Sequence, residues 1–382
     1  MIDEAAIDAL FAWMLEGARP CASANDLADG VCRRLVAAGV PVDRFALFTT
    51  VLDPNLVGWR FSWTPEEGAI ARLGELGLFA TDEYTANPVP VVSESQKPLR
   101  RRLGPDTVDE YKLFGDLVAE GFTDYLMQPV IYTTGEADAV SWATKAPDGF
   151  SDRAVAALQR INAALARLAE IHVLRLNAAN LLSAYVGRDS GDQILKGKIH
   201  RGDGEEIEAA ILFVDVVDFT RVSGGMSGPE AVAMLNAVFD LVVPPVEANG
   251  GEILKFLGDG FLAIFPYADE DGLAKAVLGA VEAIRNGETL LAASTVASDA
   301  KIRSALHAGR FHFGNVGGSG RLDFTAIGQP VNFAARLLQA ASTLGCSRVA
   351  SGLAAGHLGS GTRLTAEVEF KGFEGTQQVF TY

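Results

Sequence analysis

The stretch Gly250–Pro266 reads GGEILKFLGDGFLAIFP, two short apolar runs that carry a lysine and an aspartate. Gly258 and Gly260 flank Asp259, which predicts a tight hairpin turn between strands at 253–256 and 261–265. A charge in or beside a buried strand is costly unless an opposite charge, a metal or a ligand meets it. Lys255 and Asp259 therefore each require a partner.

A candidate partner for Asp259 lies in the run ILFVDVVDFT, residues 211–220. This run is apolar on both faces, as in a central strand, and Asp215 interrupts it. Two strand-borne carboxylates that converge favour Mg²⁺ or Mn²⁺, especially when a nucleoside triphosphate supplies further oxygen ligands. Asp218, just before the next turn, is predicted to shape that turn instead.

A third motif, DFTAIGQPVNFAARLLQ at 323–339, predicts a strand, a turn at Gly328 and a helix with Pro330 in its first turn. Asn332 and Arg336 are four residues apart and hence lie on one face of this helix. The apolar residues Val331, Ala334, Ala335 and Leu338 can then face the core. A guanidinium and an amide that project together at a helix start suit a phosphate.

In this order and spacing, FVDVVDFT, GGEILKFLGDG, TAIGQPVNFAARL and FKGF resemble the class III nucleotidyl cyclases, over roughly Glu208 to Tyr382. The resemblance implies a ferredoxin-like α/β catalytic domain with a central sheet. It also implies two Mg²⁺ or Mn²⁺ ions per active site, and a head-to-tail homodimer in which each site is shared between two chains.

The same resemblance assigns a role to each site residue. Asp215 and Asp259 would bind the metal ions, with the carbonyl of Val216 as a further ligand. Asn332 would orient the ribose, Arg336 would stabilise charge on the α-phosphoryl group, and Lys371 would hold the triphosphate. Lys255 and Thr325 would contact the purine. The carboxylates would come from one chain, and the other side chains from its partner.

The identity of the purine follows from the donors that the site offers. Lys255 can only donate hydrogen bonds, which suits the acceptor N1 of adenine and cannot satisfy the N1–H of guanine. Thr325 stands where an aspartate is common in the family, and its hydroxyl can accept from the adenine amino group. We therefore predict an adenylate cyclase that converts ATP to 3′,5′-cyclic AMP and pyrophosphate. The alternatives are a guanylate or relaxed-specificity purine cyclase, or a catalytically inactive cyclase-fold signalling module.

The N-terminal part has a helical pattern over residues 2–40, predicted strands at 44–52 and 58–64, a loop-rich middle, and strands at 125–134 and 138–146. APDGFSD at 146–152 then precedes a long helix with Ser151 as its N-cap. This order resembles a GAF-type sensor domain over residues 1–170. The alternative is a dimerising α+β domain without a ligand. The basic run KPLRRRL at 97–103 is predicted to be a solvated face.

The long helix is predicted to connect the two parts of the chain. Its residues Leu158, Ile161, Leu165 and Leu168 have the spacing of a helix-pair seam, which could join two subunits. We assign residues 151–207 to this dimerisation helix and a polar linker, and 208–382 to the catalytic domain. A small-molecule or ionic effector is expected at the N-terminal domain.

The composition sets the remaining expectations. A chain of 382 residues with 49% hydrophobic and 21% charged residues can form two soluble domains. The net charge of −16 opposes nucleic-acid binding. We find no apolar run near the roughly 20 residues that span a bilayer, and the acidic N-terminus is unlike a secretory signal. We therefore expect a cytoplasmic protein without a membrane contact.

Overall fold

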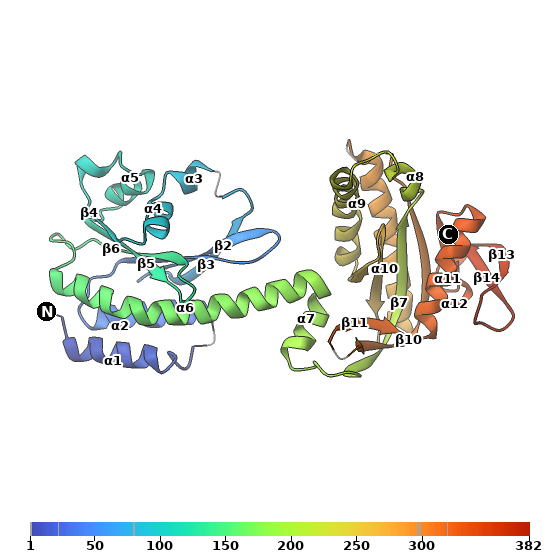
Figure 1. The fold of residues 1–382 in the computed structure, drawn as a ribbon, viewed down its shortest axis with the longest axis horizontal. Helices are drawn as coiled ribbons and strands as arrows, with labels where there is room; N and C mark the ends of the chain where they lie inside the picture. Colours follow the sequence, from blue (N-terminus) through green and yellow to red (C-terminus); the bar gives the residue numbers. More distant parts are fainter. Residues whose placement is uncertain (1, 22, 79–80, 296, 298, 319) are drawn as a thin grey trace. The chain divides into compact units, whose positions relative to one another are not determined.

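The structure is a computed structural model that describes residues 2–382 except 22, 79–80, 296, 298 and 319. The chain forms two compact units, Met1–Ala184 and Tyr185–Tyr382, which are described separately below (Figure 1). Each unit combines one β-sheet with helices, so both are mixed α/β as predicted.

In the described part of the N-terminal unit, six antiparallel strands form a sheet in the order β3-β2-β1-β6-β5-β4. Helices α1, α2 and α6 cover one face of this sheet, and α4 and α5 cover the other (Figure 1). The strands are β1 Arg44–Thr50, β2 Leu56–Thr64, β3 Gly68–Glu75, β4 Leu99–Arg102, β5 Asp124–Ile131 and β6 Ala137–Thr144. The helices are α1 Glu4–Leu15, α2 Ala24–Ala37, α3 Asp82–Thr85, α4 Pro88–Ser95, α5 Lys112–Ala119 and α6 Asp152–Val186, with the 3₁₀ turn η2 Pro105–Thr107.

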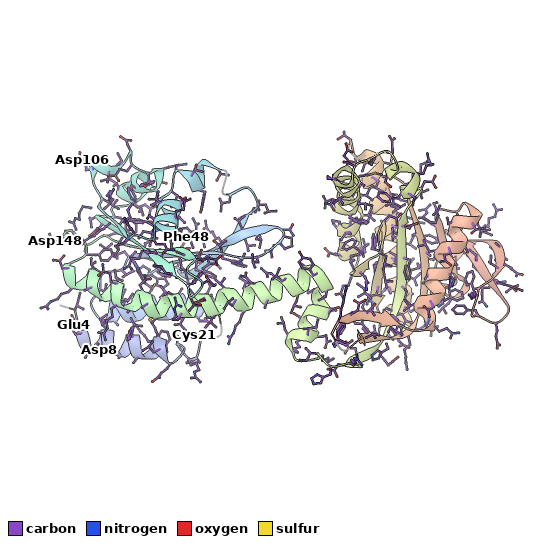
Figure 2. The ribbon with its side chains drawn as sticks, in the orientation of Figure 1. Glu4, Asp8, Cys21, Phe48, Asp106 and Asp148 are labelled. Atoms are coloured by element: carbon purple, nitrogen blue, oxygen red, sulfur yellow. The ribbon has the colours of Figure 1, made fainter. Side chains whose placement is uncertain are left out.

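Local capping explains where these helices start. The Asp3 side chain accepts from the first turn of α1, and Ser23 and Asp26 form a capping box on α2. Ser151 Oγ accepts from Ala154 N at 3.2 Å, which confirms it as the cap of α6. Asp8 on α1, labelled in Figure 2, forms an ion pair with Arg160 on α6. The resemblance of this unit to GAF-type sensor domains stays a prediction.

The prediction of a loop-rich middle is wrong. β3, α4, β4 and α5 all lie in that part of the chain. Their local sequences are poor indicators, because α4 reads PVPVVSES and β4 reads LRRR. Packing decides instead: Val92 and Phe114 are fully buried in the second core of the unit.

The prediction of a solvated basic run is also wrong for Arg100. Its Nη2 atom lies 2.7 Å from Oδ2 of Asp124, a carboxylate that is fully buried. Asp124 also accepts from Phe150 N at 2.9 Å. Arg100 of the basic run therefore links β4 to β5 and, through Asp124, to Phe150 just before α6.

The seam prediction for α6 needs a correction as well. Leu158, Ile161, Leu165 and Leu168 are buried in the core of the N-terminal unit itself. The packing of α6 on its own sheet and on α2 takes up that face. Further along the helix, Ile171, Leu174 and Leu181 are exposed.

In the described part of the C-terminal unit, eight strands form one sheet in the order β13-β14-β12-β10-β7-β9-β8, with β11 paired to β10. Only β10 and β12 pair in parallel. α9 and α10 pack on one face of this sheet, and α11 packs on the other (Figure 1). The strands are β7 Gly204–Val216, β8 Glu252–Phe256, β9 Gly260–Pro266, β10 Ile302–Gly317, β11 Leu322–Ile327, β12 Arg348–Ser351, β13 Arg363–Glu369 and β14 Thr376–Thr381. The helices are α7 Arg188–Leu195, α8 Phe219–Ser223, α9 Gly228–Ala248, α10 Glu270–Ala293, α11 Gln329–Leu344 and α12 Gly352–Ala355, with the 3₁₀ turn η3 Gly359–Gly361.

Helix α9 corrects one further expectation. With 21 residues and a mean hydropathy of 1.5, it is long and apolar enough to cross a membrane by length and composition. It is the one such helix among the described residues, which is weak evidence for a span. Val238, Val242 and Val246 of this helix are buried in the core.

Candidate nucleotide and metal site

The two predicted metal-binding carboxylates lie side by side in the C-terminal unit. Asp215, near the end of β7, is paired in register with Gly260 on β9, and Asp259 occupies the turn just before Gly260. Val216 N donates to Asp259 O at 3.0 Å, which fixes the turn against the end of β7. A Cβ atom on Gly260 would lie 2.2 Å from Val214 O, so this approach requires glycine.

The electrostatics of Asp215 reflect this crowding. Burial, together with the neighbouring Asp259 carboxylate, raises the pKa of Asp215 to about 6. The pKa rises even though Arg303 Nη1 on β10 lies 3.9 Å from Asp215 Oδ2, because that contact is too long to offset burial and a second carboxylate. A cation held between the two carboxylates would relieve their repulsion.

The donor set fits a hard divalent cation whose ligands come partly from a substrate. Two carboxylates and the nearby carbonyl of Val216 offer oxygen ligands, which Mg²⁺ and Mn²⁺ prefer. Among the described residues there is no group of three or more His, Cys, Asp or Glu side chains that could hold a metal alone. Asp218 forms the following turn in a left-handed conformation and bonds Arg221, as predicted for a turn residue.

Lys255 lies on β8 and has an acidic partner that the sequence did not reveal. Its Nζ donates to Asp323 on β11. Thr325 lies two residues further along β11, so the two side chains share one face of that strand. Lys255 of β8 therefore contacts the face of β11 that also carries Thr325, the other predicted purine-contacting residue.

Asn332 and Arg336 lie on α11 as the periodicity predicted. Asn332 is exposed, and Arg336 Nη1 donates to Gln339 Oε1 at 2.8 Å. Val331 and Ala334 are buried on the opposite side of the helix. Both polar side chains thus remain on the surface of the unit.

Lys371 is exposed in the turn after β13, and aromatic residues beside it pack on α11. Phe370 and Phe373 each have their ring centroid 5.2 Å from that of Phe333. Phe333 follows Asn332 directly in α11. The aromatic cluster therefore holds the Lys371 turn close to the helix that carries Asn332.

Within one chain, the start of α11 lies far from the carboxylate pair. Pro330 packs on β10 so closely that a Cβ on Gly309 would lie 2.7 Å from its Cγ. Gly309 pairs with Ala209 of β7, whereas the β10 partner of Asp215 is Arg303. Ala209 and Asp215 are six residues apart along β7, which corresponds to about 20 Å at 3.3 Å per residue.

Two charged residues near the predicted site were missed by sequence reasoning. Arg303 is the second residue of β10, after the apolar Ile302, and Asp323 lies two residues before Thr325. These positions are the only hint in the sequence that the two residues belong to the site. Arg303 contacts Asp215, which is 88 residues away in the sequence, and Asp323 contacts Lys255, which is 68 residues away. Pairing between distant strands creates both contacts.

A contact outside the predicted site reaches the strand of Lys255. At the start of α7, Asp189 N donates to Glu252 Oε1 at 3.1 Å. Glu252 is the first residue of β8, three residues before Lys255. The short helix that opens the C-terminal unit is thus bonded to this strand.

Comparison with known proteins gives the family of the domain that carries the paired carboxylates. Residues 204–380 match the family model of the adenylate and guanylate cyclase catalytic domain. This segment is a class III nucleotidyl cyclase domain.

Curated relatives match the same part of the chain. An uncharacterized protein of Mycobacterium tuberculosis is 35% identical over 170 residues, which are 44% of this chain and 31% of that protein. Adenylate cyclase 1 of Rhizobium meliloti is 36% identical over 149 residues, which are 38% of this chain and 22% of that protein. The match thus spans between about a fifth and a third of the length of these relatives.

Solved structures with similarity include the adenylyl cyclase CyaB from P. aeruginosa, with 24% identity and a TM-score of 0.40 over 47% of this chain and 94% of that one. The guanylyl cyclase Cya2 has 23% identity and a TM-score of 0.39 over 47% and 92% of the two chains.

Proposed function

We propose that this chain is an adenylate cyclase that converts ATP to 3′,5′-cyclic AMP and pyrophosphate at sites shared between two copies. The observation that carries the proposal is the approach of Asp215 and Asp259 in a domain of the cyclase family. Two adjacent carboxylates with one arginine at 3.9 Å are poorly compensated, and a substrate-bound metal ion would compensate them.

Asp215, Asp259 and the carbonyl of Val216 are the groups that would hold Mg²⁺ or Mn²⁺. When bound, two ions would favour ionisation of the ribose 3′-hydroxyl and neutralise the β- and γ-phosphates. The reaction forms the bond from O3′ to the α-phosphorus and breaks the bond to the pyrophosphate oxygen, while the hydroxyl proton leaves to solvent. The protein contributes positioning and charge stabilisation.

The other site residues contact the nucleotide in this proposal. Asn332 orients the ribose, and Arg336 stabilises the charge that develops on the α-phosphoryl group. Lys371 binds the triphosphate, supported by the aromatic contacts that hold its turn beside α11.

Adenine is the base that the polar groups on β8 and β11 favour. Lys255 donates to adenine N1, and Thr325 accepts from the amino group. Asp323, the present partner of Lys255, adds a second acceptor on the same face of β11. A guanylate or relaxed-specificity purine cyclase is the alternative, and a comparison of ATP and GTP turnover distinguishes the two.

The test of substrate is turnover by the full chain with ATP and with GTP, each with Mg²⁺ and with Mn²⁺, and with products separated by chromatography. We expect cyclic AMP as the main product. Lys255→Glu should lower ATP turnover, because it replaces a donor with an acceptor. Preferred formation of cyclic GMP by the unmodified chain would exclude the adenylate assignment, and absence of either product would favour an inactive signalling module.

The distance of about 20 Å along β7 between Asp215 and the level where α11 starts supports a site completed by a second copy. In a head-to-tail homodimer, the carboxylates of one copy would face Asn332, Arg336 and Lys371 of the other. We also propose regulation by an effector at the N-terminal unit and a cytoplasmic location, which the acidic, soluble composition supports.

A mixed dimer tests the shared site. Asp215→Asn and Arg336→Ala homodimers should each be inactive. A doubly tagged dimer of the two variants combines both intact halves in one of its two sites, so it should recover about half of the wild-type turnover if the sites are independent. Background turnover from a verified mixed dimer would contradict a site between chains, whereas activity of either homodimer would contradict the residue roles.

A further inference from the structure

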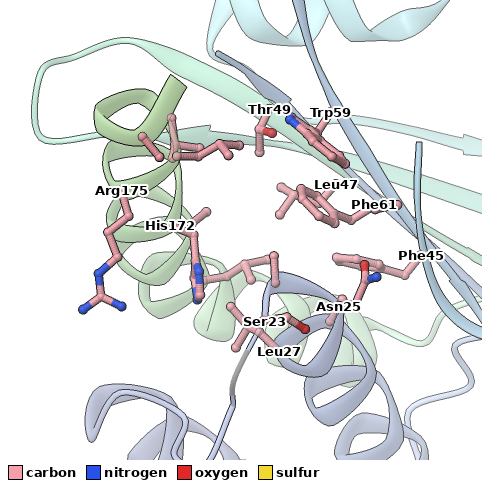
Figure 3. Close-up of a pocket in the computed structure, with 18 residues that line it drawn as sticks. Ser23, Asn25, Leu27, Phe45, Leu47, Thr49, Trp59, Phe61, His172 and Arg175 are labelled. Atoms are coloured by element: carbon pink, nitrogen blue, oxygen red, sulfur yellow. The ribbon is translucent and has the colours of Figure 1, made fainter. Parts of the chain in front are cut away.

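A cavity of about 470 Å³ lies inside the N-terminal unit, between α2, α6 and strands β1 to β3 (Figure 3). Its volume falls in the range of small-molecule binding sites. Most of its wall is apolar, with Phe45, Leu47 and Phe61 on the sheet and Leu165 and Leu176 on α6.

Three polar atoms around this cavity are buried without a hydrogen-bond partner. They are Asn25 Oδ1, Thr49 Oγ1 and Trp59 Nε1. Thr49 is only 5% exposed. Buried polar atoms in folded proteins are nearly always paired, because an unpaired one costs free energy. Three such atoms around one cavity indicate that a ligand supplies the missing partners.

The other tryptophans provide an internal comparison for Trp59. All four tryptophans of the chain lie in the described part of the N-terminal unit. Trp63 Nε1 donates to Asp29 at 2.8 Å, Trp142 Nε1 donates to Gln128 at 3.2 Å, and Trp13 Nε1 donates to a carbonyl at 2.9 Å. Trp59 is the exception, and it is the tryptophan that lines the cavity.

The unpaired atoms lie at two ends of the cavity. Thr49 and Trp59 are cross-strand neighbours on β1 and β2, and Figure 3 shows them together at one end. Asn25, from the first turn of α2, lies at the other end. Trp59 and Phe61, which both line the cavity, have nearly parallel rings with an interplanar angle of 11°. These rings give the cavity a flat aromatic wall.

The charges around the cavity do not favour an ionic ligand. Its described lining contains no aspartate or glutamate. Burial, with a smaller effect of Arg175, lowers the pKa of His172, so its ring is neutral at pH 7. The Arg175 guanidinium points away from the cavity (Figure 3).

We propose that this cavity binds a small, flat, uncharged aromatic or heteroaromatic molecule. One end of the ligand carries an acceptor, such as a carbonyl or ring nitrogen, for Trp59 Nε1 and the Thr49 hydroxyl. The other end carries an N–H or O–H group for Asn25 Oδ1. The proposal concerns binding, and it is independent of the cyclase activity proposed for the other unit.

The first test uses prodan, 6-propionyl-2-(dimethylamino)naphthalene, an uncharged fluorophore with a carbonyl acceptor. Titration of the full chain should give saturable binding with blue-shifted emission. Thr49→Val and Trp59→Phe should each weaken binding roughly three- to tenfold. Unliganded Thr49→Val should unfold at the same or a higher urea concentration, because it keeps the shape of the side chain and loses an unpaired buried polar atom. Unchanged affinity in both variants would overturn the proposal.

The second test blocks the cavity. Ala179 lines it, whereas the neighbouring Ala178 is exposed and does not. Ala179→Trp should abolish saturable prodan binding, and the matched Ala178→Trp should retain the wild-type affinity. Equal binding by these two variants would place the probe elsewhere and overturn the assignment.

A third comparison tests the Asn25 end. The monomethylamino analogue of prodan carries an N–H donor, so it should bind the wild type roughly threefold more tightly than prodan. Asn25→Ala should remove this difference, whereas persistence of the difference would contradict the role of Asn25.

If prodan affinity falls as the chain dimerises in sedimentation experiments, the cavity is filled by a second copy and the small-molecule proposal is wrong.

Discussion

Asp124 in the N-terminal unit and Asp215 in the C-terminal unit are both acidic residues at least partly withdrawn from water, with 0% and 31% of their side chains exposed, but their surroundings differ. Asp124 is fully buried, contacts Arg100 at 2.7 Å and accepts from Phe150 N at 2.9 Å. Asp215 lies beside another carboxylate, and its nearest cation is 3.9 Å away. A buried carboxylate that is paired with a cation and hydrogen-bonded stabilises the fold. A carboxylate beside a like charge marks a place where a cation can bind.

The largest expected effect lies on the Asp215 side of this comparison. Asp215→Asn should lower cyclic AMP formation at least about a hundredfold, because it removes a metal-binding carboxylate from the proposed site. Its free energy of unfolding should not fall, since the change removes one of two adjacent negative charges. The matched control is Asp218→Asn, which keeps a side chain suited to the left-handed turn and should remain active. Normal turnover in Asp215→Asn would refute the metal assignment.

Asp124 should behave in the opposite way. Asp124→Ala should lower the free energy of unfolding of the N-terminal unit by about 3 kcal/mol, because it leaves Arg100 without its carboxylate partner and the Phe150 N–H without its acceptor. Tryptophan fluorescence during urea unfolding measures this, since all four tryptophans belong to that unit. The control is Asp106→Ala on the surface, which should change the stability little. An equal effect of the two substitutions would show that the buried network contributes nothing.

A smaller effect is expected from His307, a partly buried group without a charged partner in its contacts. Burial lowers the pKa of His307 to about 4, and its Nδ1 contacts Ser351 Oγ at 2.8 Å. The unfolded chain therefore takes up a proton first as the pH falls below about 6.5. Stability of the C-terminal unit should be complete above that pH and decrease by on the order of 1–3 kcal/mol between pH 6.5 and 4.

Hydrogen exchange of β10 peptides at pH 7 and pH 5, corrected for intrinsic exchange rates, measures this loss. His307→Leu should show a weaker pH dependence than the wild type, because leucine cannot be protonated. If wild type and variant lose protection equally, other groups cause the acid sensitivity.

Periodicity and turn residues predicted the elements that carry the candidate site. The β8–β9 hairpin, the central strand β7 and helix α11 were all confirmed, since apolar runs, Gly-Asp-Gly and the Pro330 position are local signals. β4 and α4 were missed, because their stability comes from packing that no local pattern records. The roles of the site residues stay predictions.

What the sequence could not provide is the pairing of distant groups. The contacts of Lys255 with Asp323 and of Asp215 with Arg303 depend on strand order and register. The residues that carry the three unpaired atoms come from α2, β1 and β2, and each is ordinary in its own segment. Only the folded arrangement reveals that all three line one cavity.

The bond between α7 and β8 has a mechanical consequence. β8 is the edge strand of its sheet in a single chain, so β9 alone holds it through ladder hydrogen bonds. An edge strand yields to a pulling force more readily than a central strand, because fewer bonds must break. A force applied to α7 would be transmitted to β8 through the hydrogen bond between Asp189 and Glu252. Glu252 is three residues before Lys255. The strand that carries the proposed base-reading lysine is thus an edge strand of the sheet and is also bonded to the segment that enters the unit.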